Sequence, residues 1–220
     1  MAKRVIQSRQ DDIFVTCSID TASIFREFER WVTAILNCYV QPPVSGFVTT
    51  IVEGLKCLGY KKEIEFFNGL GGILNEEEVK RLPIQLYSSG PAGGAIGATA
   101  LARKYDIKNL LCGDMGGTSF DVCLAYQGEI RRSQESEING LPVKVPMVDI
   151  HTLGAGGGSI AWIDPGGALR VGPQSAGADP GPAAYGKGGT EATVTDANLV
   201  LGRLGSKRFL GGRMSLDLNA

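Results

Sequence analysis

The chain has 220 residues, of which 43% are hydrophobic and 20% charged, and its formal net charge is −1. This length is enough for one large domain or two small ones with a hydrophobic core, and the composition is that of an ordinary globular protein. The balanced charge, without a lysine- or arginine-rich block, argues against nucleic acid or a membrane as a partner, and no apolar run approaches the length of a membrane span.

Residues 1–83 predict two short strands, at 13–18 and 62–67, and three helices, at 25–40, 45–59 and 75–82. Apolar residues at helical spacing indicate the first two helices, and the pair Pro42-Pro43 is expected to separate them. Asn75 is the expected N-cap of the third helix, whose first turn is acidic.

The rest of the chain predicts strands at 84–89, 109–115, 118–136 (two strands around Gln127-Gly128) and 143–154, and helices at 90–105 and 193–204. The strand at 109–115 reads as buried, and Pro146 indicates an edge or a bulge in the strand that contains it. This order of elements predicts an α/β fold with a mixed sheet and flanking helices.

Glycine is unusually frequent, and twelve of the 31 glycines lie between residues 151 and 190. A flexible linker is one interpretation of such a stretch. Strand-like apolar residues, among them Ile160, Trp162 and Val171, interrupt it and favour ordered loops with short strands.

Five scattered cysteines form no CxxC pair and no metal-ligand spacing. We therefore expect reduced, buried thiols and a cytoplasmic protein. The first twelve residues contain no apolar core of a signal peptide, which agrees with that expectation.

The stretch 84–114 resembles a dinucleotide-binding unit, with four glycines near the start of a helix and Asp114 at the end of the next strand. The glycine spacing is GxxGGxxG rather than GxGxxG, and the chain then enters a hairpin instead of another helix. Both features argue against a nicotinamide cofactor.

Residues 113–122 read GDMGGTSFDV and suggest an anion site at a turn between two strands. The backbone N–H groups of Gly116 and Gly117 can point at one anion, and the hydroxyl of Thr118 can add a hydrogen bond. Asp114 can hold a hydrated magnesium ion or orient a water molecule. An ordinary type I′ turn also favours glycine, so these residues alone leave both interpretations open.

A second cluster reads DIHTLGAGGGS. If residues 147–152 are extended, Asp149 and His151 lie on one face of the sheet, where they can bind a divalent metal or act as acid and base. Asp179 is a candidate third ligand, and a purely structural histidine is the alternative. The loop 154–159, with Gly156 and Gly157, is either a second anion-binding loop or a site of tight strand packing.

The order of the helix at 90–105, the strand ending at Asp114, the GGT turn and the strand SFDVCLA is similar to that in the seventy-kilodalton heat-shock chaperones. A closer resemblance is to the hydantoinase A/5-oxoprolinase family, carried by SGPAGGAIGATALA, DMGGTSFDV, PVKVPMVDIHTLGAGGGSIAWID and LRVGPQSAGADPGPAAYGKGGTEATVTDANLVLGRL. That family includes ATP-dependent N-methylhydantoinase and subunits of acetone and acetophenone carboxylases.

The resemblance implies an incomplete actin-like (ribonuclease H-like) ATPase fold. Residues 1–83 would then end a first family domain, and residues 84–220 would form a second ATPase subdomain that is truncated at its C-terminus. The implied activity is ATP-dependent hydrolysis of a cyclic amide, with the substrate carbonyl activated by phosphoryl transfer. Implied partners are a cyclic amide or ketone and a hydantoinase B-type subunit.

The resemblance also implies the roles of individual residues. Gly116, Gly117 and Thr118 would hold the β- and γ-phosphates of ATP, and Asp114 would serve Mg²⁺ or the attacking water. Asp121 would contact metal-bound water or stabilise the hairpin. With the second cluster included, the candidate catalytic residues are Asp114, Asp121 and His151. Gly156 and Gly157 join the three turn residues as candidate cofactor-binding residues. The candidate metal ligands are Asp114, Asp149 and His151, which allows for a second divalent metal.

The chain also departs from the family pattern. No GGTxTD-like first phosphate loop precedes Phe14, and the adenosine-contacting part would lie beyond Ala220, so we expect an internal piece that is inactive alone. Ser18-Ile19-Asp20 replaces the family's Ser-His-Glu, and Asn68-Gly69-Leu70-Gly71-Gly72 replaces a Ser-Asn-Gly-Gly turn. The alternatives are therefore a non-catalytic nucleotide-binding or truncated paralogue, or the corresponding subunit of an acetone or acetophenone carboxylase.

Overall fold

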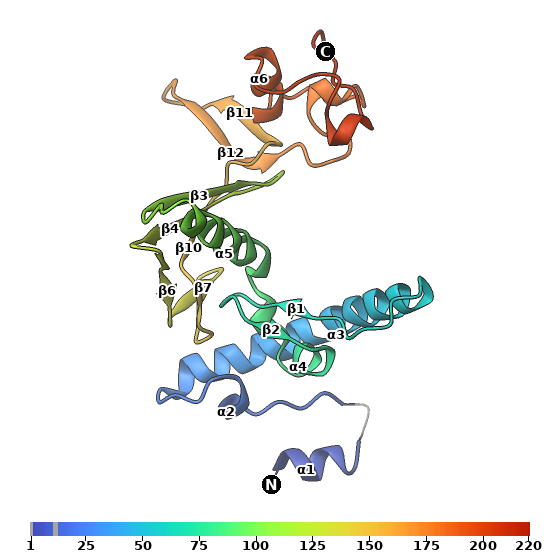
Figure 1. The fold of residues 1–220 in the computed structure, drawn as a ribbon, viewed down its shortest axis with the longest axis vertical. Coiled ribbons are helices and arrows are strands. Elements are labelled where there is room, and N and C mark those ends of the chain that lie inside the picture. The colour runs from blue at the N-terminus through green and yellow to red at the C-terminus, as the bar shows by residue number, and fades with distance from the viewer. Residues whose placement is uncertain (1, 11–12) are drawn as a thin grey trace. The chain divides into compact units, whose positions relative to one another are not determined.

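The computed structural model describes residues 2–10 and 13–220. Its helices are α1 (Ala2–Gln7), α2 (Ser18–Thr21), α3 (Glu27–Cys57), α4 (Glu76–Arg81), α5 (Ser89–Lys104) and α6 (Val194–Val200), and short 3₁₀ turns lie at η1 (Pro83–Leu86), η2 (Ala183–Tyr185) and η3 (Leu210–Gly212). The strands are β1 (Phe66–Phe67), β2 (Ile73–Leu74), β3 (Leu110–Met115), β4 (Phe120–Tyr126), β5 (Glu129–Ile130), β6 (Arg132–Ser133), β7 (Ser136–Ile138), β8 (Leu141–Val143), β9 (Met147–Val148), β10 (Ile150–Leu153), β11 (Ser159–Ile163) and β12 (Leu169–Ser175). The described part of the chain combines α-helices with several small sheets, which confirms the α/β class (Figure 1).

The described strands form several small sheets. The largest has the order β10-β4-β3, with β5 paired to β4, and the others are the two-stranded pairs β1-β2, β6-β9, β7-β8 and β11-β12. The pairs β1-β2, β4-β10, β11-β12, β4-β5, β6-β9 and β7-β8 are antiparallel. Two parallel strands need a crossover connection, such as a helix, between them. The strand expected at 84–89, ahead of α5, is not formed, because this segment is a 3₁₀ turn followed by the start of α5.

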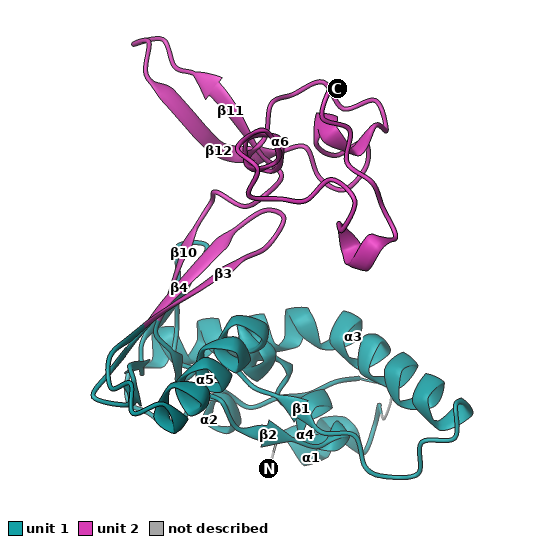
Figure 2. Cartoon of the chain, turned by 45° about the horizontal axis from the view of Figure 1, so that its top comes forward, with its two compact units in different colours: residues 1–110, 124–149 teal, residues 111–123, 150–220 magenta. Residues whose placement is uncertain are grey.

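The chain divides into two compact units (Figure 2). Unit 1 contains residues 1–110 and 124–149, and unit 2 contains residues 111–123 and 150–220. The family-domain boundary expected at residue 83 is a different division and stays a prediction.

Unit 1 is organised by α3, the long helix coloured blue to cyan in Figure 1. The prediction that Pro42-Pro43 separates two helices is wrong, because α3 runs through both prolines. Proline removes a backbone donor and crowds the preceding turn. Buried side chains before and after the pair, including Asn37 and Val48, hold both halves of the helix against the same unit, and this packing outweighs the local cost.

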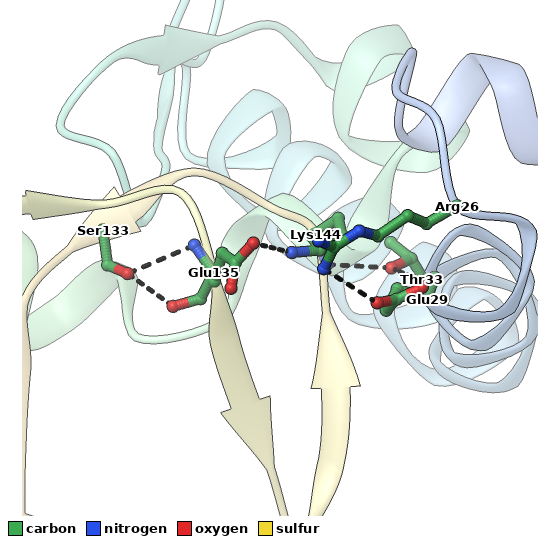
Figure 3. Close-up of polar contacts among 6 residues, drawn as sticks. All are labelled: Arg26, Glu29, Thr33, Ser133, Glu135 and Lys144. Atoms are coloured by element: carbon green, nitrogen blue, oxygen red, sulfur yellow. Dashed lines mark hydrogen bonds and ion pairs between the residues drawn. The ribbon is translucent and has the colours of Figure 1, made fainter.

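Buried polar groups attach α3 to its neighbours. Asn37 is fully buried, and its side chain donates to the carbonyl of Arg81 at 3.3 Å and accepts from the N–H of Ile84 at 3.2 Å. The hydroxyl of Thr33 accepts from the N–H of Lys144 at 3.0 Å, and the Lys144 ammonium is paired with Glu135 (Figure 3). These bonds fix the β7-β8 hairpin to the first half of α3.

Several local predictions are confirmed. Asn75 caps α4, in a capping box with Glu78. The helix expected at 90–105 is α5, and the strand expected at 109–115 is β3. Gln127 and Gly128, both with positive φ, join β4 to β5 as predicted.

Other predictions are wrong or hold in part. Residues 13–17 form no strand, and Ser18–Thr21 is the short helix α2, which packs on α3. Of the strand expected at 62–67, only Phe66–Phe67 pairs. Pro83 begins a 3₁₀ turn where a strand was expected, because proline presets a helical φ and the N–H of Ile84 bonds Asn37. The segment 143–154 is divided among β8, β9 and β10, with Pro146 between the first two.

Unit 2 contains the glycine-rich stretch, which is ordered as predicted and includes the hairpin β11-β12. A small core of Ala184, Leu199 and Leu216 holds its C-terminal part. Asp196 organises this part, since its carboxylate accepts from the N–H groups of Ala184 and Thr193, each at 2.8 Å. Burial and this carboxylate raise the pKa of Tyr185.

Cys17, Cys38 and Cys57 are free, as predicted, but burial was overestimated, because Cys38 and Cys57 are exposed and, of the five cysteines, only Cys123 is buried. The strand β3 is also more exposed than predicted, with Leu111 at 70%. None of the helices in the described part of the chain combines the length and apolar character needed to cross a bilayer.

Candidate functional site: a glycine turn braced by a glycine loop

The connection between β3 and β4 is an open turn of four residues, Gly116–Ser119, within unit 2. The N–H of Gly116 donates to the carbonyl of Ser119 at 2.9 Å, whereas the carbonyl of Gly116 accepts from Gly157. Neither Gly116 nor Gly117 has a positive φ. A type I′ turn requires positive φ at both central residues, so that interpretation of the two glycines is wrong.

Three consecutive backbone donors of this turn are unused by the described part of the chain. The N–H groups of Gly117, Thr118 and Ser119 donate to no described acceptor. The first two of these residues are exposed and Ser119 is half-buried. Successive N–H groups without a protein acceptor are the element from which anion-binding concavities are built.

Gly117 has no structural reason to be glycine. A Cβ added there would meet nothing within 4 Å, and its φ is one that other residues adopt. At Gly113, in contrast, an added Cβ would lie 2.8 Å from Cζ of Phe120, so close packing accounts for that glycine. Neither packing nor backbone φ therefore accounts for the glycine at position 117.

The loop 154–159 lies directly against the turn. The N–H of Gly157 donates to the carbonyl of Gly116 at 2.9 Å, and that of Gly158 donates to the carbonyl of Gly117 at 2.7 Å. Gly156 is buried, and a Cβ there would lie 2.5 Å from the nitrogen of Ser119. The loop thus contacts the turn backbone to backbone, with no room for a side chain.

The two candidate carboxylates of the hairpin have different surroundings. Asp121 accepts a hydrogen bond of 2.5 Å from the hydroxyl of Thr152, its partner in the β4-β10 register. Asp114 is exposed, and its carboxylate has no hydrogen bond or ion pair within the described residues. If the antiparallel register is continued from the Gly116–Ser119 hydrogen bond, Asp114 lies opposite Asp121.

His151 lies on the other face of this sheet. Its register partner in β4 is Val122, which follows Asp121, and successive residues of a strand point to opposite faces. The structure therefore does not bring His151 to the face that carries Asp121. The imidazole is exposed.

Asp149 precedes β10 and belongs to unit 1, where its carboxylate pairs with Arg131 at 3.3 Å. The continuous strand 147–152 that would align it with His151 is interrupted at this residue. Asp179 is exposed. Across residues 2–10 and 13–220, no three histidine, cysteine, aspartate or glutamate side chains gather closely enough to hold a metal ion.

Sequence reasoning missed two residues that support the turn, Thr152 and Thr195. Thr195 is buried at the start of α6, and its N–H and hydroxyl both donate to the carbonyl of Gly157 at 2.8 Å. Neither contact has a local signal, because each joins residues more than 30 positions apart.

Comparison with known proteins identifies relatives that cover this site. The hydantoinase/oxoprolinase family model matches residues 30–220. Caprolactamase subunit alpha of Pseudomonas jessenii is 38% identical over 219 residues, which are 100% of this chain and 32% of that protein. The 5-oxoprolinase of Saccharomyces cerevisiae is 39% identical over 194 residues, 86% of this chain and 14% of that protein.

A solved nucleotide-free structure from work on ATP-dependent acetone carboxylation superposes with a TM-score of 0.78 at 34% identity. The match covers 99% of this chain and 30% of the acetone carboxylase chain. The fold is accordingly that of these relatives, and the mixed α/β architecture is consistent with an incomplete actin-like fold. The 220 residues span a third or less of the length of each of these relatives.

Proposed function

The chain belongs to the hydantoinase/oxoprolinase family, and from this premise we propose that it forms the phosphate-binding part of an ATP-dependent enzyme acting on a cyclic amide. The observation that carries the proposal is the turn at Gly117. Its three adjacent N–H groups have no acceptor among the described residues, and Gly117 has no side chain although its surroundings leave room for a Cβ. Acetone carboxylase, at 34% identity, is described as ATP-dependent.

The geometry fits a polyphosphate. Gly116 and Gly117 leave the backbone open to close approach, and the N–H groups of Gly117, Thr118 and Ser119 are available to oxygens of the β- and γ-phosphates. The hydroxyl of Thr118 adds a donor. The exposed carboxylate of Asp114 fits a hydrated Mg²⁺ or a water molecule that it orients.

The other candidates take lesser roles in this proposal. The hydrogen bond to Thr152 supports a structural role for Asp121 in the hairpin. Gly156 and Gly157 contact the turn itself, which supports a bracing role rather than direct contact with the nucleotide. A second metal held by Asp149 and His151 would need further ligands, and His151 would act as an acid or base only toward a group on its own face of the sheet.

ATP would make the substrate carbonyl reactive. An amide carbonyl is a poor electrophile, and transfer of the γ-phosphoryl group to its oxygen, with release of ADP, converts that oxygen into a leaving group. The protein supplies positioning and charge neutralisation for this step, which is the usual division of labour in phosphoryl transfer.

The substrate class is proposed from the relatives. The names of caprolactamase and 5-oxoprolinase both denote action on a cyclic amide, which favours a lactam or hydantoin over a ketone. The match to acetone carboxylase supports a ketone as the second candidate. The subunit designation of caprolactamase alpha supports a requirement for a partner of the hydantoinase B type. The five scattered cysteines, without a CxxC pair, support a cytoplasmic location.

Phosphate release from ATP by the purified protein, together with any partner subunit it requires, tests this proposal. We expect hydrolysis to be stimulated by at least one of hydantoin, 5-oxoproline and caprolactam. Stimulation only by acetone or acetophenone with bicarbonate would support the carboxylase alternative. ATP binding without stimulation by any compound would indicate a non-catalytic paralogue, and no binding of ATP would contradict the proposal.

A further inference from the structure

The glycine loop that braces the turn is itself held at a single carbonyl. The oxygen of Gly157 accepts two hydrogen bonds from Thr195, one from its N–H and one from its hydroxyl, both at 2.8 Å. An added Cβ at Gly157 would lie 3.0 Å from the same hydroxyl oxygen, so the two residues are in direct contact. Because Thr195 is only 6% exposed, water cannot readily replace its hydroxyl.

A continuous series of hydrogen bonds therefore joins α6 to the turn. Thr195 holds the carbonyl of Gly157, and the N–H of Gly157 holds the carbonyl of Gly116. Next to it, the N–H of Gly158 holds the carbonyl of Gly117, while the carbonyl of Gly158 accepts from Ala176 at 2.8 Å. Since the N–H of Ser159 also donates to the carbonyl of Gly156 at 3.0 Å, the peptide units between Gly156 and Ser159 are hydrogen-bonded through both their C=O and N–H groups.

These bonds determine which way the turn presents its donors. With the carbonyls of Gly116 and Gly117 directed to the loop, the peptide planes that follow them are fixed, and the N–H groups of Gly117 and Thr118 point away from those carbonyls. If the loop were released, the two peptide units could rotate and the donors would no longer be preorganised for one anion.

We propose that Thr195 is a positioning residue for the phosphate turn, acting through Gly157 rather than by touching the nucleotide. This inference rests on the proposed function for its effect on ATP. The structural part of the inference, that Thr195 fixes the backbone of Gly116–Ser119 through Gly157, does not depend on the proposed function. The hydroxyl is the group to remove, because the backbone N–H of Thr195 remains in any substitution.

The test compares Thr195→Val, which keeps the shape and removes the hydroxyl, with Thr195→Ser, which keeps the hydroxyl. Thr50→Val is the matched control, since the Thr50 hydroxyl also bonds a backbone carbonyl, that of Gly46 at 2.9 Å, on the exposed surface of α3. Two readouts are needed in the intact protein: amide hydrogen exchange of Gly157 and Gly158 without nucleotide, and the affinity for ATP-Mg by calorimetry.

We expect Thr195→Val to speed exchange at Gly157 and Gly158, whose N–H groups bond the turn, and to weaken ATP binding by about tenfold, the effect of one buried hydrogen bond. Thr195→Ser and Thr50→Val should stay within about twofold of wild type on the same scale. Unchanged exchange in Thr195→Val, or a defect in Thr195→Ser as large as that in Thr195→Val, would overturn the positioning role.

Two outcomes separate this inference from the proposed function. If Thr195→Val exchanges faster but even the wild-type protein binds no ATP, the result would support the role of Thr195 in holding the turn and contradict the nucleotide site. If Thr195→Val does not fold, the wild-type protein still decides: the amides of Gly157, Gly158 and Thr195 should be protected and should gain protection with ATP-Mg, and a lack of protection would overturn the inference.

Discussion

The hydroxyl of Thr152 donates a hydrogen bond of 2.5 Å to Oδ1 of Asp121, and the two residues are register partners in β10 and β4. The carboxylate is thereby engaged within the sheet, whereas Asp114, near the end of β3, is exposed and unpaired in the described structure. The two aspartates of the GDMGGTSFDV hairpin are consequently expected to differ in function.

Replacing the two aspartates separately should reveal that difference. We expect Asp114→Ala to lower kcat for ATP hydrolysis by roughly 100-fold or more, as when a group that stabilises the transition state is removed, and Asp121→Ala to lower it by less than about fivefold. Thr152→Val should reproduce the effect of Asp121→Ala on thermal stability. Small and equal losses of activity in both aspartate variants would show that the hairpin does not serve the phosphates.

Gly156 tests the contact between the glycine loop and the turn. An alanine there would place its Cβ 2.5 Å from the nitrogen of Ser119, so the turn must move. We expect Gly156→Ala to lower the melting temperature and to weaken ATP-Mg binding by more than about tenfold. Gly54→Ala is the matched control, because a Cβ at that helical position meets nothing within 4 Å. Gly156→Ala with wild-type melting and binding would contradict the close packing.

Asn37 tests the buried polar contact that attaches α3 to Arg81 and Ile84, ahead of the two prolines of the helix. Asn37→Ala leaves the N–H of Ile84 and the carbonyl of Arg81 without their partner inside unit 1. We expect a loss of about 1–3 kcal/mol in the free energy of unfolding, measured by urea denaturation. The exposed Thr50→Val change should cost well under half of that. Equal stability of Asn37→Ala and wild type would argue against this contact.

The pair formed by Glu135 and Lys144 predicts a pH dependence. The hydrogen bond from Lys144 lowers the pKa of Glu135 below its ordinary value of 4.5. A carboxylate with a depressed pKa contributes stability that is complete above the unfolded value and is lost as the pH falls through the folded one. Glu135→Gln should therefore differ most from wild type near pH 7, and the difference should shrink below pH 4.5.

Melting curves between neutral and acidic pH measure this effect. Glu137→Gln is the control, because Glu137 lies in the same hairpin and forms no ion pair among the described residues. Its melting temperature should follow that of wild type at every pH. A difference for Glu135→Gln that grows as the pH falls would contradict the assignment.

Local patterns predicted the parts of the fold that local interactions determine. Asn75 with Glu78 three residues later, and Gln127 followed by Gly128, specify a cap and a tight turn by themselves. The same reasoning applied to Asn139-Gly140 would have found the β7-β8 hairpin, whose turn has positive φ at both residues.

Contacts between distant segments decided the rest. Pro42 and Pro43 suggested a break, but packing on both sides keeps α3 continuous. The glycines of the GGT turn were found from the sequence, whereas Thr152 and Thr195 required the strand register and the placement of the loop 154–159. Likewise, the opposite faces of Asp121 and His151 follow from the pairing of β4 with β10, which the sequence alone does not specify.

Calorimetric titration of ATP-Mg into the intact wild-type protein and its Gly117→Val variant tests the central claim most directly. Because a Cβ added at residue 117 meets nothing within 4 Å, the substitution should leave the melting temperature unchanged and act only on a bound phosphate. The account predicts saturable binding to wild type and binding at least about tenfold weaker to Gly117→Val. Equal affinity of the two proteins, or no binding to wild type, would contradict it.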